Sequence, residues 1–155
     1  MTYLAVKWLH ILSSTVLFGT GLGTAYYMYF ASRTRDPHIA ASVIRRAVIA
    51  DWTFTTPTIV LQPLTGLWLM QLAGFPLSTP WVAWSIVLYL IAGAAWLPVV
   101  WIQLQIRDLA FAASQLKVQL PERFWRLLRA WVSLGIVAFL SLVVVFYLMV
   151  VKPPL

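Results

Sequence analysis

The chain has 155 residues, of which 62% are hydrophobic and 10% are charged, and it contains no cysteine. A soluble domain of this length carries roughly a quarter charged residues, so this composition indicates a membrane protein. The absence of cysteine excludes disulfides, thiolate metal sites and thiol catalysis, and the grouping of the +7 net charge between apolar stretches argues against nucleic-acid binding.

Four apolar stretches are each long enough to cross a membrane as a helix, which takes about 20 residues. The first is longer than the apolar core of a signal peptide and follows no basic segment, so no cleavable signal peptide is expected. We therefore predict an all-α fold, a single transmembrane domain over residues 1–155 that forms a four-helix bundle. The expected spans are 3–30, 48–73, 81–105 and 131–151.

Positive charge gathers in the two connections that follow the first and third spans. In inner-membrane proteins such connections stay in the cytoplasm. This pattern predicts a multi-pass protein of the bacterial inner (cytoplasmic) membrane, with both termini and the uncharged turn at 74–80 on the outer side. Short interfacial helices are expected in both basic segments, over 39–46 in the first and within 107–129 in the second. The basic residues are Arg33, Arg35, Arg45 and Arg46, then Arg107, Lys117, Arg123, Arg126 and Arg129.

The first span carries a polar stripe along one helical face. Lys7 and His10 lie one turn apart near its outer end. Ionisable side chains are costly in hydrocarbon and by default indicate function, with a structural hydrogen bond as the alternative for His10. Gly19 and Gly23 form a GxxxG spacing on an adjacent strip, which favours close packing of this helix against another.

The second and third spans also carry polar faces, and prolines in the second span predict a kink. Their polar side chains are interpreted as structural. An ion pair between Asp51 and Arg107 is expected near the inner face, because both lie at that end of their spans. The structural polar residues are Asp51, Thr55, Gln62, Gln103 and Arg107.

Helical rise and periodicity gather Lys7, His10, Met70 and Tyr89 in the outer half of the bundle. Histidine and methionine are axial ligands of many haems, and bundle interiors bind such cofactors. His10 is the only histidine within a span, so it is the candidate ligand of a haem b iron, with Met70 as the second ligand or with none. Lys7 could neutralise a haem propionate. No carboxylates accompany His10, so a zinc or di-iron site is not expected.

Motifs spread over most of the chain carry a resemblance to known families: KWLH at 7–10, FGTG at 18–21, DWTFTTP at 51–57, QPLTG at 62–66, STPW at 78–81 and WLPVVW at 96–101. They resemble an uncharacterised bacterial family of four-helix integral membrane proteins, a domain of unknown function. The first half is also similar to the haem b membrane protoporphyrinogen oxidase family and to the copper-resistance D membrane proteins. The similarity to the oxidase implies that His10 ligates haem. Ala83 and Ser85 stand where that family has a histidine and a lysine, which disfavours the oxidase activity.

The expected function is therefore that of an inner-membrane protein that binds haem b through His10 in an electron-transfer or redox role. No catalytic residue is assigned, and protoporphyrinogen oxidation is the one enzymatic activity that the resemblance suggests. Two alternatives stay open: a non-enzymatic accessory subunit of a larger membrane complex, and a small transporter or permeation unit that uses Asp51. The expected partners are the lipid bilayer and either further copies of the chain or a larger membrane complex.

Overall fold

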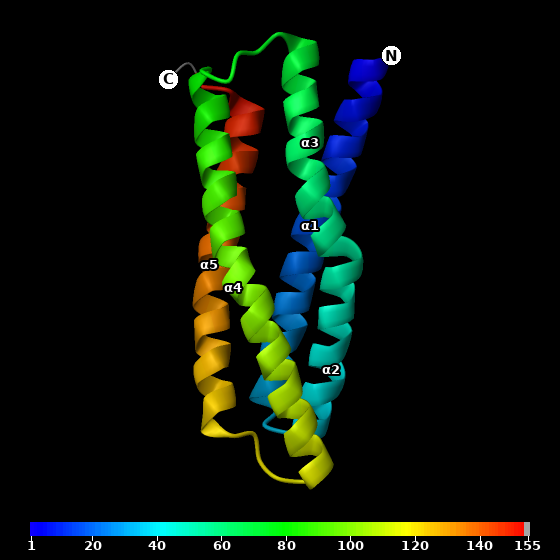
Figure 1. The fold of residues 1–155 in the computed structure, drawn as a ribbon, viewed down its shortest axis with the longest axis vertical. Coiled ribbons are helices and arrows are strands. Elements are labelled where there is room, and N and C mark those ends of the chain that lie inside the picture. The colour runs from blue at the N-terminus through cyan, green and yellow to red at the C-terminus, as the bar shows by residue number, and fades with distance from the viewer. Residues whose placement is uncertain (154–155) are drawn as a thin grey trace.

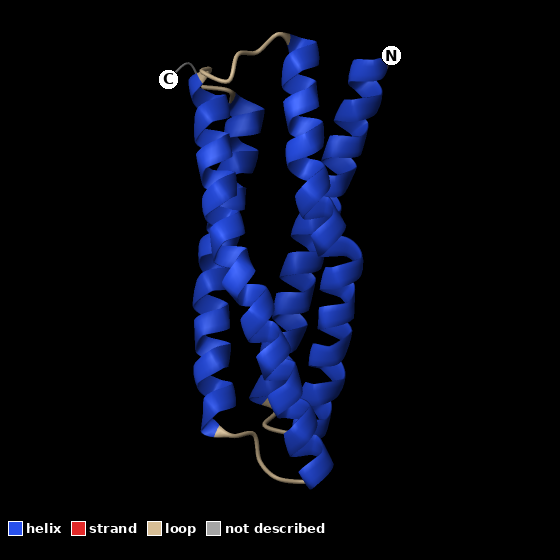
Figure 2. Ribbon diagram, viewed as in Figure 1, coloured by secondary structure: helices blue, strands red, loops and turns tan. Residues whose placement is uncertain are grey.

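All the regular structure in residues 1–153, the part of the chain that the computed structural model describes, is helical (Figure 2). The all-α prediction is confirmed. The second of the long helical rods consists of three segments that follow one another without a break: α2, the π-helical turn η1 and α3. The elements are α1 (Thr2–Arg33), α2 (Pro37–Ala50), η1 (Asp51–Thr55), α3 (Thr56–Ala73), α4 (Pro80–Leu116) and α5 (Glu122–Val151).

The rods run along the long axis of the molecule, and their connections gather at its two ends (Figure 1). The start of α1 and the end of α5 lie at the same end as the connection between α3 and α4 (Figure 1). The two basic connections, between α1 and α2 and between α4 and α5, lie at the opposite end (Figure 1). The fold therefore separates the charged connections from the uncharged one along its length.

Two of the helices, α4 and α5, are long and apolar enough to cross a membrane, with mean hydropathies of 2.1 and 2.9 over their most apolar segments. They contain the spans expected at 81–105 and 131–151 and extend beyond them. The helices α1 and α3 are not apolar enough to be counted with them. Polar side chains along both helices lower their mean hydropathy, so spans at 3–30 and 48–73 stay predictions.

The interfacial helix expected at 39–46 is not a separate element. The Asp36 side chain accepts hydrogen bonds from the backbone N–H groups of His38 (2.8 Å) and Ile39 (3.3 Å), which caps α2. No glycine or further proline occurs between Pro37 and Asp51, and α2 continues through η1 into α3. Its apolar face packs against α1 and α4 instead of lying on a membrane surface, with Ala40 and Ile44 fully buried.

The interfacial helix expected within 107–129 is wrong for a similar reason. Helix α4 continues to Leu116 and ends where Lys117 adopts a left-handed conformation with φ of 53°. Helix α5 then starts directly after Pro121, whose extended backbone (φ −70°, ψ 158°) stands outside the helix. Phe124 and Leu128 are buried in the bundle, so the first turns of α5 belong to the core, whereas Phe111 and Leu116 at the end of α4 are exposed.

The hydrophobic core lies in the half of the bundle near the basic connections, where α2, α4 and α5 meet the end of α1. In the other half the helices associate as two pairs, α1 with α3 and α4 with α5. Phe18 on α1 joins the two pairs by packing against two rings of α5. Its ring centroid lies 4.7 Å from that of Phe139 and 5.5 Å from that of Phe146. His10 lies in the half of the bundle that is away from the basic connections, at the interface of α1 and α3.

Candidate functional site

His10 is tied to α3 through one ring nitrogen. Its Nδ1 lies 2.7 Å from the Oγ1 atom of Thr65, and the Thr65 hydroxyl also lies 2.6 Å from the Leu61 backbone oxygen. Because the single hydroxyl proton of Thr65 is donated to Leu61, the Thr65 oxygen accepts from the Nδ1–H group of His10. This pattern assigns the tautomer in which Nε2 keeps its lone pair. Within residues 1–153, Nε2 makes no hydrogen bond.

Gly66 allows the imidazole to approach α3 closely. A Cβ atom at this position would lie 3.3 Å from Cε1 of His10, which is tighter than an ordinary van der Waals contact. The ring edge formed by Nδ1 and Cε1 therefore faces α3. Thr65 and Gly66 together determine the position and the orientation of the ring.

The backbone at His10 is held by the same pair of helices. The Gln62 amide nitrogen on α3 donates hydrogen bonds to the backbone oxygen of His10 (2.9 Å) and to the Ser13 hydroxyl. Gln62, Ser13 and Thr65 are all buried. Buried polar side chains that satisfy one another determine how two helices dock, so this seam sets the register of α1 against α3.

The other three residues predicted for the outer cluster are spread over three helices: Lys7 on α1, Met70 on α3 and Tyr89 on α4. Lys7 is exposed on α1, with its ammonium 5.9 Å from the ring centre of Tyr3. Met70 is half-buried on α3, one turn beyond Gly66. Tyr89 on α4 donates a hydrogen bond to the Ile59 backbone oxygen at 2.5 Å. Within residues 1–153 none of the three is hydrogen-bonded to His10, and their roles toward a cofactor stay predictions.

A second polar group surrounds Asp51 in η1. Its Oδ1 accepts hydrogen bonds from the hydroxyls of Thr55 (3.0 Å) and of Thr24 on α1 (3.3 Å). Its Oδ2 accepts from the Gln103 amide on α4 at 2.7 Å. The predicted polar residues Asp51, Thr55 and Gln103 are thus brought together. Thr24 lies on α1, and the packing of α1 against η1 brings its hydroxyl to Asp51.

The predicted ion pair between Asp51 and Arg107 is wrong. Arg107 pairs with its neighbour Asp108 at 2.8 Å. Gln103 lies one turn before Arg107 on α4 and takes the position that faces Asp51. Within the described residues, the Asp51 carboxylate therefore accepts hydrogen bonds from neutral groups only and forms no ion pair.

The π-helical turn that carries Asp51 has a cause in the next turn. Pro57 has no N–H group, and its ring would collide with a carbonyl of the preceding turn in a regular α-helix. The wider turn relieves this contact, and the backbone N–H of Thr56 bonds to the Asp51 oxygen five residues before it. The Thr56 hydroxyl adds a second bond to the same oxygen at 3.1 Å. Such π-turns inside helices are frequent at functional sites.

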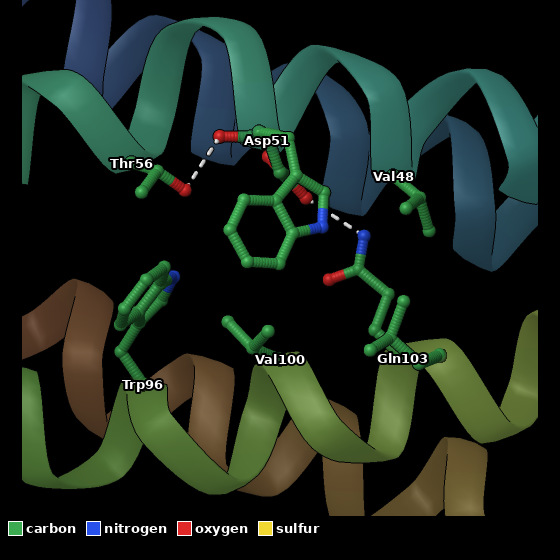
Figure 3. A pocket seen from close by; sticks show the side chains of 8 residues that line it. Val48, Asp51, Thr56, Trp96, Val100 and Gln103 are labelled. Carbon is green, nitrogen blue, oxygen red and sulfur yellow. Dashed lines mark hydrogen bonds between the residues drawn. The ribbon is translucent and has the colours of Figure 1, made fainter.

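A small pocket lies beside Asp51, between η1 and α4. Figure 3 shows Asp51 and Gln103 turned toward each other, with Trp96 and Val100 of α4 on the opposite side from Thr56. The pocket has room for about one water molecule. Its lining residues are Val48, Asp51, Trp52, Thr56, Trp96, Val100, Gln103 and Leu104.

Similarity to known proteins places the chain in a family. Residues 4–153, nearly the whole chain, match the model of the DUF2269 family, which is described as a predicted integral membrane protein. The protein belongs to this family. No curated protein and no solved structure matches the chain. The predicted membership of an uncharacterised membrane-protein family is confirmed.

The family description agrees with the apolar helices of this DUF2269 protein, which is a helical integral membrane protein. Residues 1–153 contain no group of three or more histidine, cysteine or carboxylate side chains that could hold a metal ion. Among these residues, His10 has its Nδ1 bonded to Thr65 and its Nε2 without a hydrogen-bond partner.

The GxxxG residues of the DUF2269 chain have no close neighbour in the bundle. A Cβ atom at Gly19 or at Gly23 would meet no other helix within 4 Å. The expected close packing of this strip is therefore not made by the described residues of the chain itself. It stays a prediction for contact with another chain.

Proposed function

We propose that this DUF2269 protein binds haem b through His10 and carries electrons, or responds to redox state, in the bacterial inner membrane. The observation that carries the proposal is the 2.7 Å hydrogen bond between His10 Nδ1 and Thr65. Histidines that bind metals generally donate their other ring N–H to an oxygen, which orients the ring and makes the ligating nitrogen more basic. His10 has this arrangement.

The surrounding residues define what the chain would contribute to such a site. Thr65 holds the imidazole in one tautomer, and Gly66 lets it lie against α3. Lys7, one turn from His10 toward the outer end of α1, would pair with a propionate. Bound haem would supply a one-electron couple, whose potential depends on the axial ligands and on burial.

We also propose that the protein spans the inner membrane four times, with both termini outside. The arrangement of the connections supports this topology, because the two basic connections share one end of the bundle (Figure 1). Positively charged connections are retained in the cytoplasm. In this orientation His10 lies in the outer half of the membrane and Asp51 in the inner half.

An optical spectrum of the protein purified from haem-supplied cells tests the cofactor. We expect a Soret band and about one haem per chain, by pyridine haemochrome assay, with both lost in His10→Ala. His38→Ala, which removes the other histidine of the chain, is the matched control and should leave the spectrum unchanged. Thr65→Val should retain haem with a shifted reduction potential. A wild-type protein without haem, or an unchanged haem content in His10→Ala, would overturn the proposal.

A further inference from the structure

Asp51 is a carboxyl group that the haem proposal does not use. It lies at the junction of α2 and α3, where α1 packs against the same turn and the Gln103 side chain of α4 reaches it. We infer that Asp51 is a proton-binding site within the membrane-spanning bundle, which takes up and releases one proton. The inference does not depend on haem binding.

The hydrogen bonds of Asp51 are the first support for this inference. Three donors from three segments converge on its carboxylate: the hydroxyls of Thr24 and Thr55 and the Gln103 amide, at 3.3, 3.0 and 2.7 Å. All three donors are neutral. They orient the carboxyl group, but they leave its negative charge uncompensated. A charge in such surroundings is costly, and uptake of a proton removes it.

The charged groups on the neighbouring elements do not provide a counter-charge. On α4 the nearest is Arg107, which is paired with Asp108 at 2.8 Å. On α2 they are Arg45 and Arg46, which are both exposed. Helix α1 has no charged residue between Lys7 and Arg33, and α3 has none at all. Within residues 1–153, the Asp51 carboxylate is therefore an isolated charge.

A proton suits this site better than a metal cation. Sodium, calcium and magnesium ions are generally held by about six oxygen ligands. Asp51 is the only carboxylate at the site, and three hydrogen-bond donors already point at its oxygens. The adjoining pocket has room for about one water molecule, which is too little for a hydrated ion. A proton needs only one carboxylate oxygen to bind it and one hydrogen-bond acceptor for the O–H group that forms.

The same pocket has room for a water molecule beside Asp51 that would pass the proton on. A water molecule in it would touch both Asp51 and Gln103, since both residues line the pocket. When an incoming proton is passed by this water to the carboxylate, the water stays neutral and the new O–H group needs an acceptor. A half-turn of the Gln103 amide would present its carbonyl oxygen to that O–H. Gln103 is therefore a positioning residue, and Asp51 is the group that binds the proton.

Infrared difference spectroscopy of the full chain in lipid nanodiscs tests the inference. The chain has only four carboxyl side chains, so their bands can be separated by mutation. Between high and low pH we expect a protonated-carboxyl band that shifts in D2O and disappears in Asp51→Asn. Asp36→Asn and Asp108→Asn are matched controls, because both remove exposed carboxyls; they should leave this band in place.

Two variants of the hydrogen-bond donors to Asp51 and a comparison of two salts complete the test. Thr55→Val and Gln103→Leu each retain the carboxyl and remove one of its hydrogen bonds, so each should change the frequency of the Asp51 band. These variants serve if Asp51→Asn fails to fold. A spectrum with no band that depends on Asp51, or a band unaffected by both variants, overturns the inference. A band that is present in N-methylglucamine chloride and lost in sodium chloride also overturns it, because Asp51 would then bind a metal cation.

Discussion

The Tyr89 hydroxyl on α4 donates a hydrogen bond to the backbone oxygen of Ile59 on α3, at 2.5 Å. In a regular helix this oxygen would accept from the N–H group of residue 63, but residue 63 is a proline and has none. Tyr89 therefore satisfies the carbonyl that Pro63 leaves free. This contact also joins the two helix pairs in the half of the bundle where α3 and α4 do not pack backbone against backbone.

The first prediction concerns this bond. Tyr89→Phe removes only the hydroxyl, and we expect it to lower the free energy of unfolding by about 1 kcal/mol, since the Ile59 oxygen loses its partner in an apolar region. In a Pro63→Ala background the restored N–H group bonds to the same oxygen, so Tyr89→Phe should then have little effect. Unfolding in mixed micelles by SDS titration measures all four proteins. Equal effects of Tyr89→Phe in both backgrounds would show that the bond is not the source of the loss.

The second prediction concerns the close contact between His10 and Gly66. Gly66→Ala places a methyl group against the imidazole, which must move by a few tenths of an ångström. If His10 ligates haem, this shift should reduce haem content or displace the Soret band. Gly23→Ala is the matched control, because a Cβ atom there meets nothing within 4 Å. Identical spectra for Gly66→Ala and the wild type would place the ligand elsewhere.

The third prediction concerns the polar seam between α1 and α3. Gln62→Leu keeps the approximate size of the side chain and removes its hydrogen bonds to Ser13 and to the His10 oxygen. We expect a loss of about 1 kcal/mol in the free energy of unfolding, typical of polar contacts between membrane helices. Ser13→Ala combined with Gln62→Leu should cost less than the sum of the two single changes. Gln119→Leu, at an exposed position in the connection to α5, should have no effect.

The fourth prediction concerns topology. The chain has no cysteine, so single cysteines report directly on the side of the membrane. Ser78→Cys, in the connection between α3 and α4, should react with a membrane-impermeant maleimide in intact spheroplasts. Gln119→Cys, in the basic connection between α4 and α5, should react only after lysis. Both positions are exposed, so an inverted labelling pattern would establish the opposite orientation.

The sequence by itself determines the helical class, the order of the helices and the grouping of charge at one end. Long apolar stretches can satisfy their backbone polar groups in a membrane only by forming helices, and the helical period of 3.6 residues decides which side chains share a face. This is why the polar faces of the first three spans could be predicted. For the same reason the pattern of residues alone singles out His10, Asp51, Thr55, Gln62 and Gln103.

Only the tertiary structure decides which helices face one another and at what depth. Periodicity relates residues within one helix and says nothing about the rotation of one helix against the next. Asp51 is therefore bonded to Gln103 and Thr24, while Arg107 pairs with Asp108. The same applies to Thr65 and Gly66 beside His10, and to Tyr89 at the carbonyl that Pro63 leaves free. These contacts depend on the packing of residues that are distant in the chain, which local sequence patterns do not encode.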